Sequence, residues 1–213
     1  SWIMSRPTFS EYHDACEIAG HDFCNDVEDA GLVWICNPNN PTGEMVDRAR
    51  LRDMASCNPE KVVVIDQSYS EYTEAPLLSP ADASAMGNVI LIGSFTKRFG
   101  VPGLRLGYMV GNAELMIRMR ANARPWTVSQ LGIDAGIYLL DHAEEYRLPL
   151  PMLLDEARRV GERLTSIGIK ASPMATPFFL CETPECKSAS QLKEYLIAVS
   201  YTHLRAHETS QDL

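Results

Sequence analysis

The sequence predicts an α/β fold with a mostly parallel sheet, because short apolar runs alternate with segments of helical periodicity. Three runs rich in Val and Ile are apolar on both faces, which is typical of strands buried within a parallel sheet. They comprise residues 32–36, 61–66 and 88–93. A chain of 213 residues, 46% of them hydrophobic, suffices for one sizeable core or for one and a half domains.

The other elements of the first part of the chain continue this alternation. Residues 45–57 separate the first two strands with helical periodicity, and residues 105–110 form a fourth strand candidate. Helices are expected over residues 113–123 and 128–146. We interpret residues 1–147 as one large, incomplete domain.

The pattern changes beyond a Leu-Pro-Leu-Pro run. An amphipathic helix is expected over residues 153–167, a strand candidate at residues 178–181 and a further helix over residues 190–198. This predicts the start of a small α+β domain over residues 148–198, which the chain does not complete.

The end of the sequence differs in character. Residues 199–213 show no clear apolar period, and the stretch from Ser200 resembles a translated transposase-based sequencing adaptor. We favour this interpretation over a native helical tail, and expect the segment to be non-native and without function.

Composition excludes several classes of protein. The net charge of −9 argues against a nucleic-acid binder, since contacts to phosphates need a basic surface. No apolar run approaches membrane-spanning length and no signal peptide opens the chain, so cytoplasm is the expected compartment. The six cysteines are scattered and the five histidines lack ligand spacing, so we expect reduced thiols and no metal site.

The segment from Ser94 to Gly107 contains the most informative residues. It sets Lys97 among Ser, Thr and Gly residues, and Arg105 follows eight residues later. Lysine forms Schiff bases with aldehyde cofactors, and arginine is suited to gripping phosphate. Pyridoxal phosphate (PLP) carries both groups, so one loop can hold both ends of it. Most lysines are solvated surface charges, and that alternative would prevail for Lys97 alone.

Three residues at earlier strand ends agree with this interpretation. Asn40 lies in the Asn-Pro-Asn-Asn-Pro-Thr-Gly run after the first strand, where parallel sheets bind ligands; its amide can donate to a phenolate oxygen. The bond from Asn40 to Pro41 is a candidate for the cis form. Asp66 closes a buried strand, where an ionised carboxylate needs a cation such as a protonated pyridine nitrogen. Tyr69 can bond the same phenolate as Asn40. Taken singly, these are ordinary turn, loop and core-edge residues.

In combination, N-P-N-N-P-T-G, D-x-x-Y and S-F-T-K-R-F-G-V-P-G-L-R-L-G resemble the class I/II aminotransferase family, which are PLP enzymes of fold type I. The resemblance extends over about residues 5–198. It implies that Lys97 forms the Schiff base with PLP and that Asp66 pairs with the pyridine nitrogen. Asn40 and Tyr69 would hold the ring hydroxyl.

The same resemblance assigns the other contacts of the cofactor. It implies that Ser94 and Arg105 bind the phosphate. The run from Pro7 to Tyr12 is similar to the segment whose aromatic residue stacks on the ring, so Phe9 is the implied stacking residue. A plain core phenylalanine is the alternative for Phe9.

Two branches of the family share features with this chain. The double asparagine and the run from Arg124 to Ser129 resemble histidinol-phosphate aminotransferases. The Pro-Trp pair in that run, Phe9 and the run from Ile133 to Gly136 are more similar to L-threonine-O-3-phosphate decarboxylases of cobalamin biosynthesis, which we favour. Both branches imply a small phosphorylated amino acid or amino alcohol as substrate and a homodimer. The bond held perpendicular to the PLP ring decides between the reactions.

The chain also departs from the family pattern. The Gly/Ser-rich helix start that binds phosphate and the C-terminal arginine that holds the substrate carboxylate are absent from it. We therefore expect a fragment that is inactive by itself. A non-catalytic PLP-binding module, as in some transcription regulators, and a cofactor-free scaffold are alternatives that the intact site residues disfavour.

Overall fold

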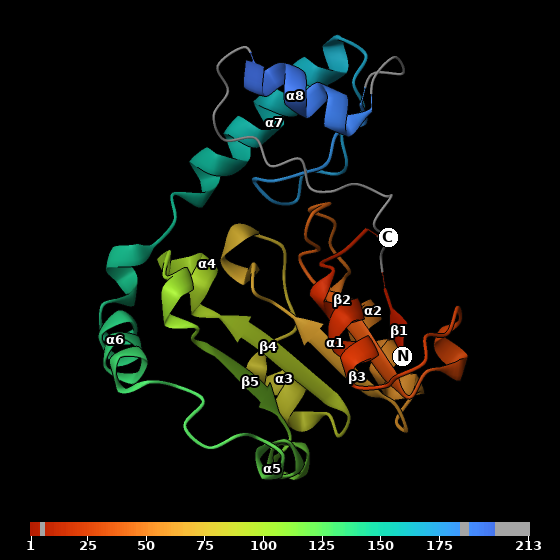
Figure 1. Ribbon diagram of the computed structural model, residues 1–213, viewed down its shortest axis with the longest axis vertical. Coiled ribbons are helices and arrows are strands. Elements are labelled where there is room, and N and C mark those ends of the chain that lie inside the picture. The colour runs from red at the N-terminus through yellow and green to blue at the C-terminus, as the bar shows by residue number, and fades with distance from the viewer. Residues whose placement is uncertain (5–6, 184–187, 199–213) are drawn as a thin grey trace.

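The computed structural model describes residues 1–4, 7–183 and 188–198. Within them a five-stranded sheet has the order β1-β2-β3-β4-β5 (Figure 1). Its strands are β1 (Trp2–Ile3), β2 (Leu32–Cys36), β3 (Val62–Asp66), β4 (Val89–Ser94) and β5 (Gly107–Gly111). The first four are parallel and β5 is antiparallel to β4, so the predicted α/β fold with a mostly parallel sheet is confirmed.

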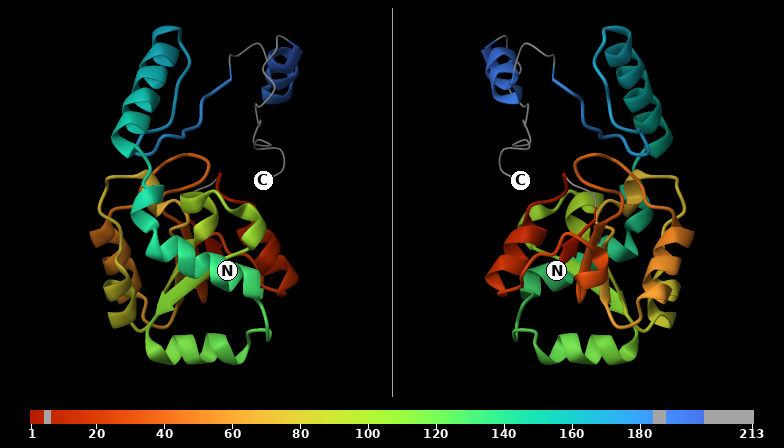
Figure 2. Two further views of the ribbon diagram at one scale, coloured as in Figure 1. Left: turned by 90° about the vertical axis from the view of Figure 1, so that its left-hand side faces the viewer. Right: turned by 90° about the vertical axis from the view of Figure 1, so that its right-hand side faces the viewer.

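The helices follow the strands in alternation and then form the C-terminal part of the chain. They are α1 (Glu11–Ile18), α2 (Arg48–Cys57), α3 (Pro80–Ala85), α4 (Phe95–Phe99), α5 (Ala113–Ala121), α6 (Gln130–Asp141), α7 (Leu150–Ser166) and α8 (Ala189–Ala198). Figures 1 and 2 show α7 and α8 beyond one end of the sheet, with α6 leading into α7.

The main core lies on one face of the sheet, because successive strand residues point to opposite faces. Val33, Ile35, Val63, Ile65, Val89 and Leu91 pack there against Leu51 and Ala55 of α2 and Ala83 of α3. The opposite face packs Val64 and Ile90 against Leu115 of α5, and Ile3 and Cys36 against Tyr12 of α1. Figure 2 accordingly shows α2 and α3 on one side of the sheet and α1 on the other.

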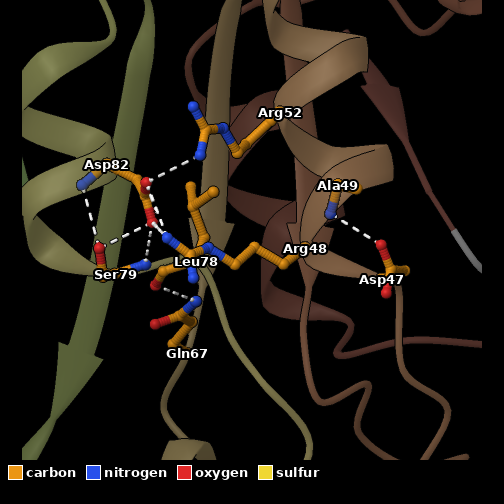
Figure 3. A network of polar contacts seen from close by, with 8 residues as sticks. All are labelled: Asp47, Arg48, Ala49, Arg52, Gln67, Leu78, Ser79 and Asp82. Atoms are coloured by element: carbon orange, nitrogen blue, oxygen red, sulfur yellow. Dashed lines mark hydrogen bonds and ion pairs between the residues drawn. The ribbon is translucent and has the colours of Figure 1, made fainter.

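A polar network joins α2 to α3 outside the core (Figure 3). The Asp82 carboxylate accepts hydrogen bonds from the Ser79 backbone N–H and hydroxyl, at 2.9 and 2.7 Å, and pairs with Arg48 at 2.8 Å. The Ser79 hydroxyl in turn accepts from the Asp82 backbone N–H, which completes a capping box at the start of α3.

Several expected elements differ in detail. The helix expected over residues 128–146 consists of α6 and a separate 3₁₀ turn over residues 143–146. Helix α7 begins at Leu150, before the expected start, because Pro151 is tolerated in a first helical turn. Sequence analysis did not identify β1, α1 or α3, which are short. The predicted tail over residues 199–213 lies outside the described residues.

The strand candidate at residues 178–181 is wrong. This segment makes only an isolated bridge, between Ala171 and Cys181, with hydrogen bonds from Ser172 N to Leu180 O and from Glu182 N to Lys170 O. Pro173 and Pro177 flank the paired stretch. Proline has no N–H to donate, so the ladder cannot lengthen in that direction. The domain boundary expected near residue 148 stays a prediction.

Candidate functional site

The registers of the parallel strands place three loops side by side. Cys36, Asp66 and Ile92 are neighbours across β2, β3 and β4. The backbone N–H of Asn37 continues the ladder to Asp66 O at 2.9 Å, and that of Gln67 to Ile92 O at 2.8 Å. The segments that follow these strands therefore emerge at one edge of the sheet, where ligands of parallel sheets bind.

A cavity of about 370 Å³ lies at this edge. All seven residues expected from the sequence to form a site line it: Phe9, Asn40, Asp66, Tyr69, Ser94, Lys97 and Arg105. The structure thus brings together side chains that are up to 96 positions apart in the sequence, Phe9 and Arg105 being the extremes. Sequence analysis missed Tyr12, Cys36, Ser68 and Thr96, which line the same cavity.

The Asp66 carboxylate is fixed at both oxygens. Oδ2 accepts a hydrogen bond from Tyr12 Oη at 2.7 Å, and Oδ1 accepts one from the Ser68 backbone N–H at 2.8 Å. We expected this carboxylate to depend on a cation, yet two uncharged donors already bind it. Its remaining lone pairs are available to a ligand in the cavity, which Asp66 lines.

Burial keeps the groups around Asp66 protonated. The pKa of the Tyr12 phenol is raised far above its ordinary value, first by burial and then by the proximity of Cys36 and Asp66. Burial also raises the pKa of the Cys36 thiol to about 11. Cys36 Sγ donates to Pro38 O at 3.3 Å. At neutral pH both groups are therefore uncharged donors beside the carboxylate.

The two adjacent asparagines have different positions. Asn39 is buried, and its side chain bonds to neighbouring protein groups. Its amide donates to Pro7 O at 3.0 Å and to Thr42 Oγ1 at 2.8 Å, and its oxygen accepts a hydrogen bond from Thr8 Oγ1 at 2.6 Å. These bonds fasten the segment that carries Phe9 to the loop after β2. Asn40 instead lines the cavity, and its bond to Pro41 is cis.

Lys97 lies on a short helix rather than in the loop that the sequence predicted. Helix α4 starts directly after β4, where Ser94 Oγ caps it by accepting from Thr96 N at 3.1 Å. Lys97 is exposed, with Nζ 5.3 Å from the centroid of the Tyr69 ring. The Tyr72 hydroxyl donates to Lys97 O at 2.9 Å and so fastens α4 to the segment after β3.

Phe9 and Arg105 both line the cavity and are both exposed. Phe9 is 42% exposed, and its ring makes a T-shaped contact with that of Tyr12, with centroids 5.6 Å apart. Arg105 adopts the left-handed backbone conformation at φ 51°, which is uncommon for a residue with a side chain.

A C-terminal segment also reaches the site, which sequence analysis did not foresee. The Phe178 ring packs against Tyr69 with centroids 4.8 Å apart. The Ser172 hydroxyl donates to Thr42 O. Gly43 lies so close that an added Cβ would be 2.5 Å from Phe178 O. Residues 172–178 therefore dock on the loop after β2 and on one wall of the cavity.

A cluster of possible metal ligands lies outside this cavity. His13, Asp14 and Glu17 on α1 bring possible ligand atoms within 4.8 Å of one another, but all three are exposed, and the His13 ring stacks on Phe23. Among the described helices, none combines the length and the apolar character needed to cross a membrane.

The chain thus has an α/β fold with a cavity at the ends of its strands, and a lysine, a carboxylate and an arginine line this cavity. These features define a class of ligand-binding protein. The chain belongs to the aminotransferase class I and II family, whose model matches residues 5–207, and the resemblance seen in the sequence is thereby confirmed.

Curated relatives include histidinol-phosphate aminotransferases. That of Ruminiclostridium cellulolyticum is 27% identical, over 87% of this chain and 57% of the relative. That of Caldicellulosiruptor saccharolyticus is 30% identical, over 67% of this chain and 45% of the relative. The chain thus spans about half the length of these relatives.

Solved structures include members of both branches. L-threonine-O-3-phosphate decarboxylase from Porphyromonas gingivalis is 31% identical with a TM-score of 0.86, covering 93% of this chain and 64% of that one. Histidinol-phosphate aminotransferase from Sinorhizobium meliloti, in complex with pyridoxal-5'-phosphate, is 20% identical with a TM-score of 0.79, covering 93% of this chain and 59% of that one. The latter likeness establishes the fold alone.

Proposed function

We propose that the cavity binds pyridoxal 5'-phosphate and that the protein is a PLP-dependent enzyme acting on a small phosphorylated amino compound. The single observation that carries this proposal is the convergence of seven expected residues on one cavity of about 370 Å³. The donor set fits the cofactor: an amine, a carboxylate bound by two donors, and an arginine. When bound, PLP supplies an electron-withdrawing ring that accepts the electron pair of a bond broken at the substrate α-carbon.

Four residues act on the reactive part of the cofactor in this proposal. Lys97 would bond to the aldehyde carbon through Nζ with release of water, and the same nitrogen would move a proton at the substrate α-carbon. Asp66 pairs with the ring nitrogen through a carboxylate that Tyr12 and Ser68 orient. Asn40 and Tyr69, which both line the cavity, orient the ring oxygen.

Three further residues position the cofactor. Arg105 and Ser94 bind its phosphate, for which a guanidinium offers several donors in a fixed planar arrangement. Phe9 packs against one face of the ring. Its contact with Tyr12 and the bonds of Asn39 to Pro7 and Thr8 support this placement.

We favour decarboxylation of O-phospho-L-threonine as the reaction. The likeness to the Porphyromonas gingivalis decarboxylase supports this choice, because identity of 31% accompanies a TM-score of 0.86 over 93% of the chain. The Pro125-Trp126 pair and Phe9 also support decarboxylation, because they resemble the corresponding residues of the decarboxylase branch.

Transamination of histidinol phosphate is the second candidate. It is supported by the curated relatives, of which the one from Ruminiclostridium cellulolyticum aligns over 87% of the chain. A homodimer in the cytoplasm is proposed for either reaction on the family resemblance, and light scattering of the purified protein tests the dimer.

The cofactor assignment is tested on Lys97. PLP added to the chain is expected to give a near-visible absorption band, and Lys97→Ala should abolish it because no other described lysine lines the cavity. Borohydride reduction followed by peptide mapping should place the label on Lys97. Lys170→Ala, which removes an exposed lysine outside the cavity, is the matched control and should leave the band unchanged. A band that survives Lys97→Ala would contradict the proposal.

The reaction is tested with two substrates, on this chain and on any longer product of the same gene. Carbon dioxide released from O-phospho-L-threonine supports the decarboxylase. Glutamate formed from histidinol phosphate and 2-oxoglutarate supports the aminotransferase instead. Loss of a catalytic amine lowers turnover by about 10²–10⁴-fold, so Lys97→Ala should be inactive in either assay. PLP binding without turnover of any amino compound by the longer gene product would favour a non-catalytic module, whereas absence of turnover by this chain alone is the result expected of a fragment.

A further inference from the structure

Tyr12 joins α1 to the end of β3 at the cavity, which both Tyr12 and Asp66 line. It lies on α1, 54 positions from Asp66 in the sequence, and donates to Asp66 Oδ2 at 2.7 Å. Its side chain is almost fully buried, with 5% exposed. The ring stacks on Trp34 of β2, with centroids 5.0 Å apart and planes 16° apart, so the phenol has a fixed direction.

In the hydrogen bond between Tyr12 and Asp66, Tyr12 is always the donor and Asp66 the acceptor. Burial and the nearby Cys36 and Asp66 raise the pKa of Tyr12, so the phenol keeps its proton and always donates. Asp66 must then accept, and a carboxylate accepts best when it is ionised. With the Ser68 N–H bound at the other oxygen, both carboxylate oxygens have a donor that fixes their orientation.

We propose that Tyr12 is a positioning residue, which holds the Asp66 carboxylate in a fixed orientation toward a positively charged ring nitrogen. This role rests on the proposed function, because the ring nitrogen belongs to the cofactor. A positioning role differs from a purely structural role in one respect: the effect of removing the Tyr12 hydroxyl on ligand affinity depends on whether the ligand has that nitrogen.

The test uses Tyr12→Phe, which removes only the hydroxyl and keeps the ring that contacts Trp34 and Phe9. Affinity is measured for PLP and for a PLP analogue in which carbon replaces the ring nitrogen. A lost hydrogen bond to a charged group should weaken PLP binding by about tenfold or more. The analogue should bind the variant as well as it binds the wild type.

Two further variants complete the test. Asp66→Asn should abolish the preference for PLP over the analogue, and adding Tyr12→Phe to it should have little further effect, because the two residues act as one unit. Tyr138→Phe removes an exposed hydroxyl on α6 outside the cavity and should change neither affinity.

The outcomes separate the two proposals. An equal loss of affinity for both compounds in Tyr12→Phe, or no loss for PLP, overturns the positioning role while the proposed function stands. A wild-type chain that binds neither compound overturns the proposed function and this role with it. Circular dichroism of each variant establishes that it is folded.

Discussion

Arg105 illustrates how one residue can reveal a functional constraint. It adopts the left-handed conformation at φ 51° and ψ 44°, which costs a residue with a side chain about 1–2 kcal/mol relative to ordinary backbone. Glycine would occupy the turn without this cost, and Gly103 and Gly107 lie two positions away on either side. Strained residues cluster at functional sites, and Arg105 lines the cavity. The structure therefore supports a role for its side chain in binding.

Arg105→Gly should leave the protein at least as stable and yet weaken PLP binding by about tenfold or more, since each charge-assisted hydrogen bond is strong. Arg105→Ala loses the same guanidinium but keeps the strain, so the glycine variant should be about 1 kcal/mol more stable than the alanine variant. Thermal unfolding and PLP titration measure the two effects. A glycine variant less stable than the alanine variant would show that the left-handed turn is not strained.

At the scale of elements, a single carboxylate joins two helices on the same face of the sheet. Asp82 completes the capping box of α3 and also pairs with Arg48 of α2, with Arg52 further away at 3.4 Å (Figure 3). The hydroxyl of Ser79, and then Arg48, holds the pKa of Asp82 well below its usual range. The network thereby couples the position of α2 to that of α3, which both cover the main core.

The stability that Asp82 contributes should depend on pH. Its pKa is lower in the folded than in the unfolded chain, so the contribution is fully present above the unfolded value of 3.8 and is lost as pH falls toward the folded value. Urea unfolding should show Asp82→Asn destabilised at pH 7, with the gap to wild type narrowing below about pH 4. Arg52→Ala, which removes an exposed and more distant partner, is the control with the smaller effect. A gap that does not change with pH would contradict the assignment.

At the scale of the whole molecule, the C-terminal part is attached to the sheet domain at the site itself. Residues 172–178 dock on the loop after β2 through Ser172, Gly43 and the ring of Phe178. Helix α7 precedes this segment and lies beyond the same end of the sheet as the helix α4 (Figures 1 and 2). The wall of the cavity near Tyr69 therefore depends on elements from both parts of the chain.

Gly43→Ala should disturb this docking. At φ +72° an alanine is strained by about 1–2 kcal/mol, and its Cβ would also be 2.5 Å from Phe178 O. Gly20→Ala is a matched control, because Gly20 has φ +73° with no atom within 4 Å of an added Cβ. Gly43→Ala should therefore lower the melting temperature more than Gly20→Ala and increase proteolysis within residues 172–178. Equal behaviour of the two variants would show that the contact contributes nothing.

The sequence by itself determined the α/β class, the three buried parallel strands and the order of the site residues along the chain. These features are local: a run such as Val62–Asp66 is apolar on both faces whatever lies next to it. The positions of Asn40, Asp66 and Lys97 after successive strands then imply one edge of one sheet, because parallel strands end on the same side.

Only the tertiary structure decided how the site is held. The hydrogen bond from Tyr12 to Asp66 and the contact of Phe178 with Tyr69 join segments 54 and 109 positions apart. Such contacts depend on how α1 and residues 172–178 pack against the sheet, and local periodicity carries no information about packing between distant segments. Likewise, β5 runs antiparallel because the turn through Gly103 and Arg105 reverses the chain, which its apolar pattern alone could not reveal. The local sequence encodes the strand segments and the chemistry of the site residues, whereas the orientation of the reactive groups comes from long-range packing.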